Sequence, residues 1–130
     1  MKSLSKIIIS FLLSISIIFF NSQDKVLAIS DVDWLLLKEN NDGKEWIDLG
    51  SLKKITDNEI SVLTRFFKVT DPVKDEGVTS LYVMRINCDN KQFKDTAING
   101  IPNFKAKWKS SNNDELIDVV IEKSCSQIFS

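Results

Sequence analysis

The sequence VTSLYVMRINC, residues 78–88, predicts a long β-strand around which the rest of the chain can be arranged. β-Branched, aromatic and aliphatic residues fill it, and it contains neither Gly nor Pro. Successive side chains of a strand point to opposite faces. The even positions therefore share one face of the predicted sheet: Tyr82, Met84, Ile86 and Cys88.

A β-hairpin is predicted well before this strand. The apolar runs at 34–38 and 45–49 are short enough for strands, and the segment between them reads ENNDGK. Asn, Asp and Gly tolerate the positive φ angles of tight hairpin turns. The polar segment 50–58 then predicts a connection rather than a regular element.

Three further strands are predicted beside the long one. The segments ISVLTRFFKV at 60–69 and QFKDTAI at 92–98 flank it, separated from it by turn-forming residues. The segment 103–109 alternates most regularly. We expect one face of this strand to be buried, and it carries Phe104, Ala106 and Trp108. We expect the other face to be in contact with water, and it carries Lys105, Lys107 and Lys109.

A C-terminal helix is predicted over residues 114–124 because the apolar positions change to helical spacing. Asn112 is the predicted N-cap, and Glu115 three residues later completes a pair similar to a capping box. Cys125 follows Ile121 by four residues, so we expect it to leave the helix on the buried face. About six antiparallel strands with one C-terminal helix packed on them make an α+β domain.

The two cysteines, Cys88 and Cys125, predict one disulfide if the chain is exported, because an even number of Cys in an oxidising compartment usually pairs. Their predicted positions, on the sheet face and on the buried side of the helix, favour this pairing. Two free thiols or an intermolecular bridge are the alternatives. A metal site is disfavoured because two Cys without His supply only half of a zinc site.

The first 28 residues predict a signal peptide. Lys2 and Lys6 precede an uncharged run of 14 residues at 7–20, and small residues at Val26 and Ala28 suit cleavage after Ala28. A retained membrane anchor is the alternative, but a 14-residue helix reaches about 21 Å, short of a hydrocarbon core of about 30 Å. No Cys follows the run for lipid attachment. Residues 29–130 then form a single domain.

Composition limits the function classes. Charged residues make up 27% and hydrophobic residues 43% of the chain, which is typical of a folded domain. Residues 29–130 carry 14 basic and 17 acidic side chains, a balance that disfavours nucleic-acid binding. The chain has no His and no closely spaced glycines, so no catalytic nucleophile with its base, no metal ligand set and no cofactor loop is predicted.

Acidic groupings do not alter this expectation. The pairs Asp31 with Asp33 and Asp75 with Glu76 fall in a predicted terminus and a predicted loop, where solvated carboxylates are ordinary. The run from Asn40 to Gly43 resembles calcium ligands, but no ligand pattern of the right length follows it. It is better interpreted as the hairpin turn.

Two features predict a binding surface. Phe66 and Phe67 are neighbours in a predicted strand, so one of them must leave the main core unless the helix or a partner covers the second face of the sheet. An exposed aromatic there suits an interface. The basic stripe on 103–109 would supply a cationic rim, although a solvated strand face is the ordinary interpretation of such a stripe. The predicted contacts of a macromolecular partner are Phe66, Phe67, Lys105, Lys107 and Lys109.

The order of landmarks resembles the bacterial surface-adhesin protein E family over about residues 33–126. The residues that carry the resemblance are Trp34, WIDLGSLKK at 46–54 with Asp48 and Ser51, Asn87-Cys88-Asp89, Gln92-Phe93, Gly100, Trp108 and Cys125. The resemblance implies an antiparallel sheet packed by a C-terminal helix, tied by one disulfide and exported to the bacterial envelope.

The best-known member of that family is an outer-membrane adhesin that binds host matrix proteins and haem. This chain lacks the lipoprotein Cys, and without His its only candidate axial haem ligands are Met84 and Tyr82. The expected function is therefore that of an exported, non-catalytic binding module, in the periplasm or at the cell surface, with a macromolecular partner. A small periplasmic enzyme or an inhibitor-like protein is the alternative.

Overall fold

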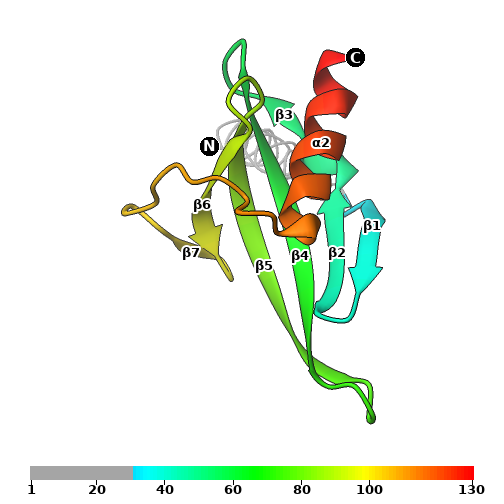
Figure 1. Ribbon diagram of the computed structural model, residues 1–130. Coiled ribbons are helices and arrows are strands. Elements are labelled where there is room, and N and C mark those ends of the chain that lie inside the picture. Colours follow the sequence, from blue (N-terminus) through cyan, green and yellow to red (C-terminus); the bar gives the residue numbers. More distant parts are fainter. Residues whose placement is uncertain (1–30) are drawn as a thin grey trace, which may run out of the picture. The chain divides into compact units, whose positions relative to one another are not determined.

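A seven-stranded antiparallel sheet carries one helix across one face in the computed structural model, which describes residues 31–130 (Figure 1). The strand order is β1-β2-β4-β5-β6-β7, and β3 pairs with β4 beside β2. The elements are β1 (Trp34–Asn40), β2 (Gly43–Asp48), the 3₁₀ turn η1 (Leu49–Ser51), β3 (Lys53–Lys54), β4 (Glu59–Asp71), β5 (Glu76–Asn87), β6 (Gln92–Ile98), β7 (Ile101–Pro102) and α2 (Glu115–Phe129). The predicted α+β class is confirmed.

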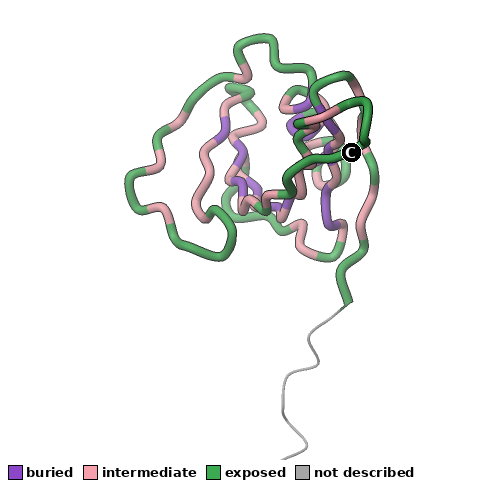
Figure 2. The backbone as a smooth tube through the Cα atoms, turned by 90° about the horizontal axis from the view of Figure 1, so that it is seen from below, coloured by how far each residue is buried: buried purple, intermediate pink, exposed green. Residues whose placement is uncertain are grey.

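The hydrophobic core lies between the helix and the inner face of the sheet, the face that α2 covers. Ile60 opposite Ile86 and Val62 opposite Met84 form its centre on the β4–β5 hairpin. Figure 2 shows the buried stretches inside the outline of the domain. The core cluster consists of Ile47, Ile60, Val62, Met84, Ile86, Phe93, Val120 and Ile121. The even positions of the long strand do share the inner face, as predicted.

The predicted disulfide is present and closes this core at one end. Cys88 follows β5 directly, Cys125 lies on α2, and their Cα atoms are 5.8 Å apart. Both cysteines pack against the core cluster. The bridge therefore ties the helix to the sheet.

The helix differs from its prediction at both ends. It starts at Glu115 with Asp114 as N-cap, whose carboxylate accepts from the backbone N–H groups of Leu116 and Ile117. Asn112 has a φ of 52° and its side chain accepts the Ser110 hydroxyl instead, so the prediction of Asn112 as cap was wrong. The helix continues to Phe129, because no Gly or Pro interrupts it, and Cys125 lies within it.

The prediction of a strand over 103–109 was wrong. Only Ile101–Pro102 pairs with β6, after a turn at Asn99 and Gly100 with positive φ angles. The Asn103 side chain then donates to the carbonyl of Asp95, which takes a ladder position on the edge of β6. The chain leaves the sheet there and returns only at Lys109, which bridges Phe93.

Because residues 103–109 do not form a strand, one of their two aromatic side chains is exposed. Phe104, expected in the core, is 96% exposed. Trp108 is half-buried, with the Lys94 ammonium 4.7 Å from its ring. Regular alternation predicted one buried face here, but the segment has no sheet partner to bury it.

In the part of the chain from residue 31 onward, no helix has the length and apolar character needed to span a membrane. The predicted signal peptide and its cleavage site after Ala28 lie outside the described residues.

Candidate binding site

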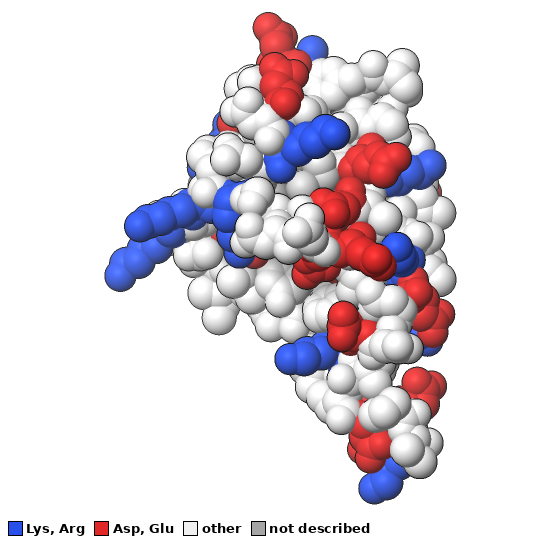
Figure 3. Space-filling model, in the orientation of Figure 1, with Lys and Arg blue, Asp and Glu red and all other residues white. Residues whose placement is uncertain are grey.

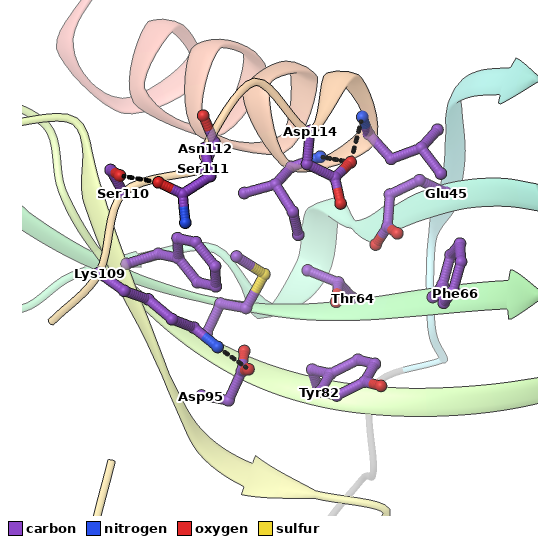
Figure 4. Close-up of a pocket in the computed structure, with 14 residues that line it drawn as sticks. Glu45, Thr64, Phe66, Tyr82, Asp95, Lys109, Ser110, Ser111, Asn112 and Asp114 are labelled. Carbon is purple, nitrogen blue, oxygen red and sulfur yellow. Dashed lines mark hydrogen bonds and ion pairs between the residues drawn. The ribbon is translucent and has the colours of Figure 1, made fainter. Parts of the chain in front are cut away.

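A cavity of about 350 Å³ lies between the inner face of the sheet, the first turn of α2 and the segment 109–114 that leads into it (Figure 4). The sheet contributes its floor and the segment 109–114 its rim. Of the rim residues, Ser110, Asn112 and Asp114 are exposed, whereas Ser111 is half-buried. A volume of this size falls at the lower end of the range for small-molecule sites, about 300–1,000 Å³.

Most of the floor is apolar and aromatic. Phe66 on β4, Tyr82 and Met84 on β5 and Phe93 on β6 line it. They meet there because antiparallel pairing brings alternate residues of neighbouring strands onto one face. Ile117 of α2 closes the cavity from the helix side.

Glu45 is the exceptional group in this floor. It lies in the middle of β2 and is only 3% exposed. The pKa of its carboxyl is raised to about 8, mainly by burial and to a smaller extent by the nearby carboxylates of Asp114 and Asp95, while the neighbouring Thr64 hydroxyl offsets part of the increase. Glu45 is therefore largely protonated near neutral pH while the cavity is empty.

A second acid, Asp95, lies across the cavity with a cation beside it. The Lys109 ammonium lies 3.6 Å from its carboxylate and 4.9 Å from the Phe93 ring. Burial raises the pKa of Asp95, and Lys109 opposes that shift. Lys109 therefore makes these contacts within the domain while its side chain stays 56% exposed.

The predicted contact residues separate in the structure. Phe66 lines the cavity, whereas Phe67 points to the outer face and packs over Gly77. Both rings are half-buried, so neither is a fully exposed anchor. Lys105 and Lys107 are exposed on the loop between β7 and α2, and only Lys109 turns toward the cavity. The five residues thus do not form one surface.

Sequence reasoning missed two features. The first is a pair of exposed large hydrophobic residues: Phe104, on the loop that carries Lys105 and Lys107, and Ile101 of β7, which is 71% exposed. Glu45 was also missed. The only signal in the sequence was that Glu45 shares a strand face with the apolar Ile47, two residues later. That pattern does not distinguish a buried acid from an exposed acid at the edge of a sheet.

The outer face carries an aromatic group of its own. The Arg65 guanidinium lies 4.7 Å from the Trp34 ring and 4.2 Å from the Trp46 ring, so it is held between two indoles. Such cation–π contacts contribute roughly 0.5–2 kcal/mol each, depending on exposure. They explain how two tryptophans remain on the face that lies away from the helix.

Within residues 31–130, no three His, Cys, Asp or Glu side chains are grouped so as to hold a metal ion. One family model, that of the surface adhesin-E family, matches residues 35–130, which is nearly all of the described domain. No curated protein sequence and no solved structure gives a significant match.

Proposed function

Since the chain belongs to the surface adhesin-E family, we propose that this adhesin-like envelope protein is exported and binds a macromolecule without catalysing a reaction. The carrying observation is the loop between β7 and α2, where Phe104 is 96% exposed and Lys105 and Lys107 are exposed beside it. An aromatic side chain with a polar rim is the composition that protein interfaces favour.

The charge pattern supports an acidic partner. Figure 3 shows Lys and Arg side chains projecting with the loop between β7 and α2, whereas Asp and Glu side chains gather around the start of α2. Because residues 29–130 carry an excess of acidic side chains overall, this local basic group is a distinct feature of the surface. Opposite charge on a partner would steer association toward the loop.

Phe66, Phe67 and Lys109 stay predicted contacts of the partner. Each of them also has a place within the domain. Phe66 lines the cavity, Phe67 packs over Gly77, and Lys109 pairs with Asp95. Phe104, Lys105 and Lys107 are therefore the sharper test, because replacing them disturbs no described core contact.

Binding can be tested with immobilised host matrix proteins and with an extract of the producing cell's own envelope. We expect Phe104→Ala, and separately the double change Lys105→Gln with Lys107→Gln, to reduce capture while the unfolding midpoint stays unchanged. The matched control is Lys53→Gln with Lys54→Gln, which removes two exposed lysines from β3. Equal capture by all three variants would place the interface elsewhere.

Export rests on the first 28 residues of the sequence, with their basic start, apolar run and Val-x-Ala site. N-terminal sequencing of the protein recovered from its host should begin at Ile29. A recovered chain that retains residues 7–20 would contradict cleavage and favour a membrane anchor.

A second candidate function, a small hydrolytic enzyme, is favoured by the raised pKa values of Glu45 and Asp95 in one cavity. Chromogenic glycosides and esters are suitable probes because paired carboxyl groups can act as acid and base. Turnover that Glu45→Gln abolishes would establish this alternative, whereas turnover that survives the substitution would assign the activity to another group or a contaminant.

A further inference from the structure

We propose that the cavity beneath α2 binds a small organic amine as its ammonium cation, with the charged head at Glu45 and the apolar body against Phe66 and Tyr82. This site is separate from the loop that we propose for the macromolecular partner. Its residues come from β2, β4 and β5 and meet at the inner face of the sheet (Figure 4).

Two buried polar groups, Glu45 and Thr64, lie next to each other on the floor of this cavity. The residue Glu45 is 3% exposed, and its carboxyl lies close enough to the Thr64 hydroxyl for that neighbour to lower its pKa. The Thr64 hydroxyl, also on the floor, is fully buried and has no hydrogen-bond partner among residues 31–130. Buried polar groups in folded proteins are nearly always paired, and one hydroxyl cannot satisfy both oxygens of an ionised carboxylate. The two groups therefore leave room for a ligand that donates hydrogen bonds. An ammonium group has up to three N–H donors.

The basic side chains near the cavity are already engaged. Lys109 pairs with Asp95 at 3.6 Å. Lys38 lies opposite Glu45 in the β1–β2 register, but its ammonium pairs with Glu115 on α2 at 3.0 Å. Neither ammonium forms an ion pair with Glu45, so a bound ammonium group would not have to displace a resident cation from this carboxyl.

The start of α2 would by itself attract an anion, since a helix N-terminus carries roughly half a positive charge. Here Asp114 already caps it, accepting from two of its free N–H groups. The three acidic groups Glu45, Asp95 and Asp114 line the cavity against the single ammonium of Lys109. The balance of charge therefore favours a cation over an anion.

The walls specify an organic cation rather than a metal ion. Phe66, Tyr82 and Phe93 present aromatic surface, which attracts ammonium groups through cation–π contacts and buries hydrocarbon. Metal ions of the magnesium and calcium type need several oxygen ligands, and no such cluster exists in the described domain. An amine with an apolar body matches both the acid and the aromatic rings.

Release of a proton from Glu45 on ligand binding is a measurable signal that a purely structural role of Glu45 would not produce. Thr64, Asp95, Asp114, Lys109 and Tyr82 line the cavity together with Glu45, and Lys38 lies opposite Glu45 in the β1–β2 register. The pKa of Glu45 is about 8 in the empty cavity. A bound ammonium stabilises its ionised form, so binding near pH 7 releases a proton from Glu45. Affinity should rise between about pH 6 and pH 8 and then level off, as long as the amine itself stays protonated.

The test is calorimetric titration of the protein obtained from the full chain with benzylamine, benzoate and benzyl alcohol. These probes share a ring and differ in charge. We expect saturable binding of benzylamine, with proton release seen as a buffer-dependent heat at pH 7, and no binding of benzoate. Glu45→Gln should weaken benzylamine binding about tenfold or more, whereas the exposed control Glu122→Gln should leave it unchanged.

Three outcomes would overturn the assignment. They are absence of benzylamine binding at millimolar concentration, equal binding of benzoate, and binding without proton release that Glu45→Gln does not affect. Proton release is measured on the wild-type protein, so this part of the test does not require the Glu45→Gln variant to fold. Failure here would leave the loop proposal untouched, because Phe104, Lys105 and Lys107 do not line the cavity.

Discussion

The Ser51 hydroxyl accepts the backbone N–H of Leu63 at 2.7 Å and donates to the carbonyl of Asp48 at 2.8 Å. Leu63 pairs with Val83 of β5 but has no strand partner on the opposite edge of β4, because pairing with β2 ends at Thr64 and pairing with β3 begins at Ser61. Ser51 therefore bridges a gap in the sheet. The WIDLGS segment, which is part of the family resemblance, therefore has a structural role in connecting β2 to β4.

Replacing Ser51 by Ala should destabilise the domain by about 1–3 kcal/mol, since the Leu63 N–H loses its acceptor in a partly buried position. Chemical unfolding followed by circular dichroism measures the change. Ser126→Ala is the matched control, because its hydroxyl lies on the exposed side of α2 and bonds the Lys123 carbonyl. A loss at Ser51 no larger than at Ser126 would show that water replaces the hydroxyl.

The Cys88–Cys125 bridge closes a span of 37 positions, for which the chain-entropy relation gives about 4 kcal/mol. Changing both cysteines to Ser should therefore lower the free energy of unfolding by about 2–5 kcal/mol. Unfolding of the wild type with reductant should show a similar loss. Reductant that lowers the stability of the Ser variant as well would reveal an effect unrelated to the bridge.

Stability should fall as pH rises from about 4.5 to 8. The folded protein keeps the Glu45 proton up to a pKa of about 8, whereas the unfolded chain releases it near 4.5, so ionisation favours unfolding in this window. The raised pKa of Asp95 acts in the same direction. The Glu45 contribution is at most about 5 kcal/mol.

Glu45→Gln isolates that contribution. The variant should show a flatter dependence of unfolding free energy on pH and should exceed the wild type in stability at pH 8. Glu59, whose pKa Arg85 lowers through a hydrogen bond, titrates below this window and should not interfere. A wild type whose stability rises from pH 5 to pH 8 would contradict a buried, protonated Glu45.

Phe67 and Gly77 should be energetically coupled. A Cβ atom added at Gly77 would collide with the Phe67 ring and with the carbonyl of Lys68. Gly77→Ala and Phe67→Ala should each destabilise the domain by about 1–3 kcal/mol, the first by overpacking and the second by uncovering the glycine. A double-mutant cycle should show that the losses are not additive. Additivity within about 0.5 kcal/mol would mean that the contact carries no stability.

Much of the fold follows from local patterns. The turn at Asn40–Gly43, the alternation along Val78–Cys88 and the helical spacing before Cys125 correspond to a hairpin, a strand and a helix in the structure. The turn is specified by residues that tolerate positive φ angles. The strand and the helix are specified by the spacing of their apolar residues, which marks the face that becomes buried. The disulfide was open to prediction because two cysteines in an oxidising compartment, which the predicted export implies, have few options.

The binding features did not follow in this way. Alternation in 103–109 is a local property, but burial requires a neighbouring strand, and the side chain of Asn103 diverts the chain from β6. Phe104 is exposed for that reason. The environment of Glu45 likewise depends on three other strands, a helix and a loop that converge on it.

The sequence was thus sufficient for the type of most elements other than the segment 103–109, for the cysteine pair and for the family, since these depend on spacing along the chain. Phe104, Glu45 and the cap at Asp114 required the packed structure. Exposure and pKa are set by the atoms that surround a side chain, and most of those atoms belong to residues far away in the sequence.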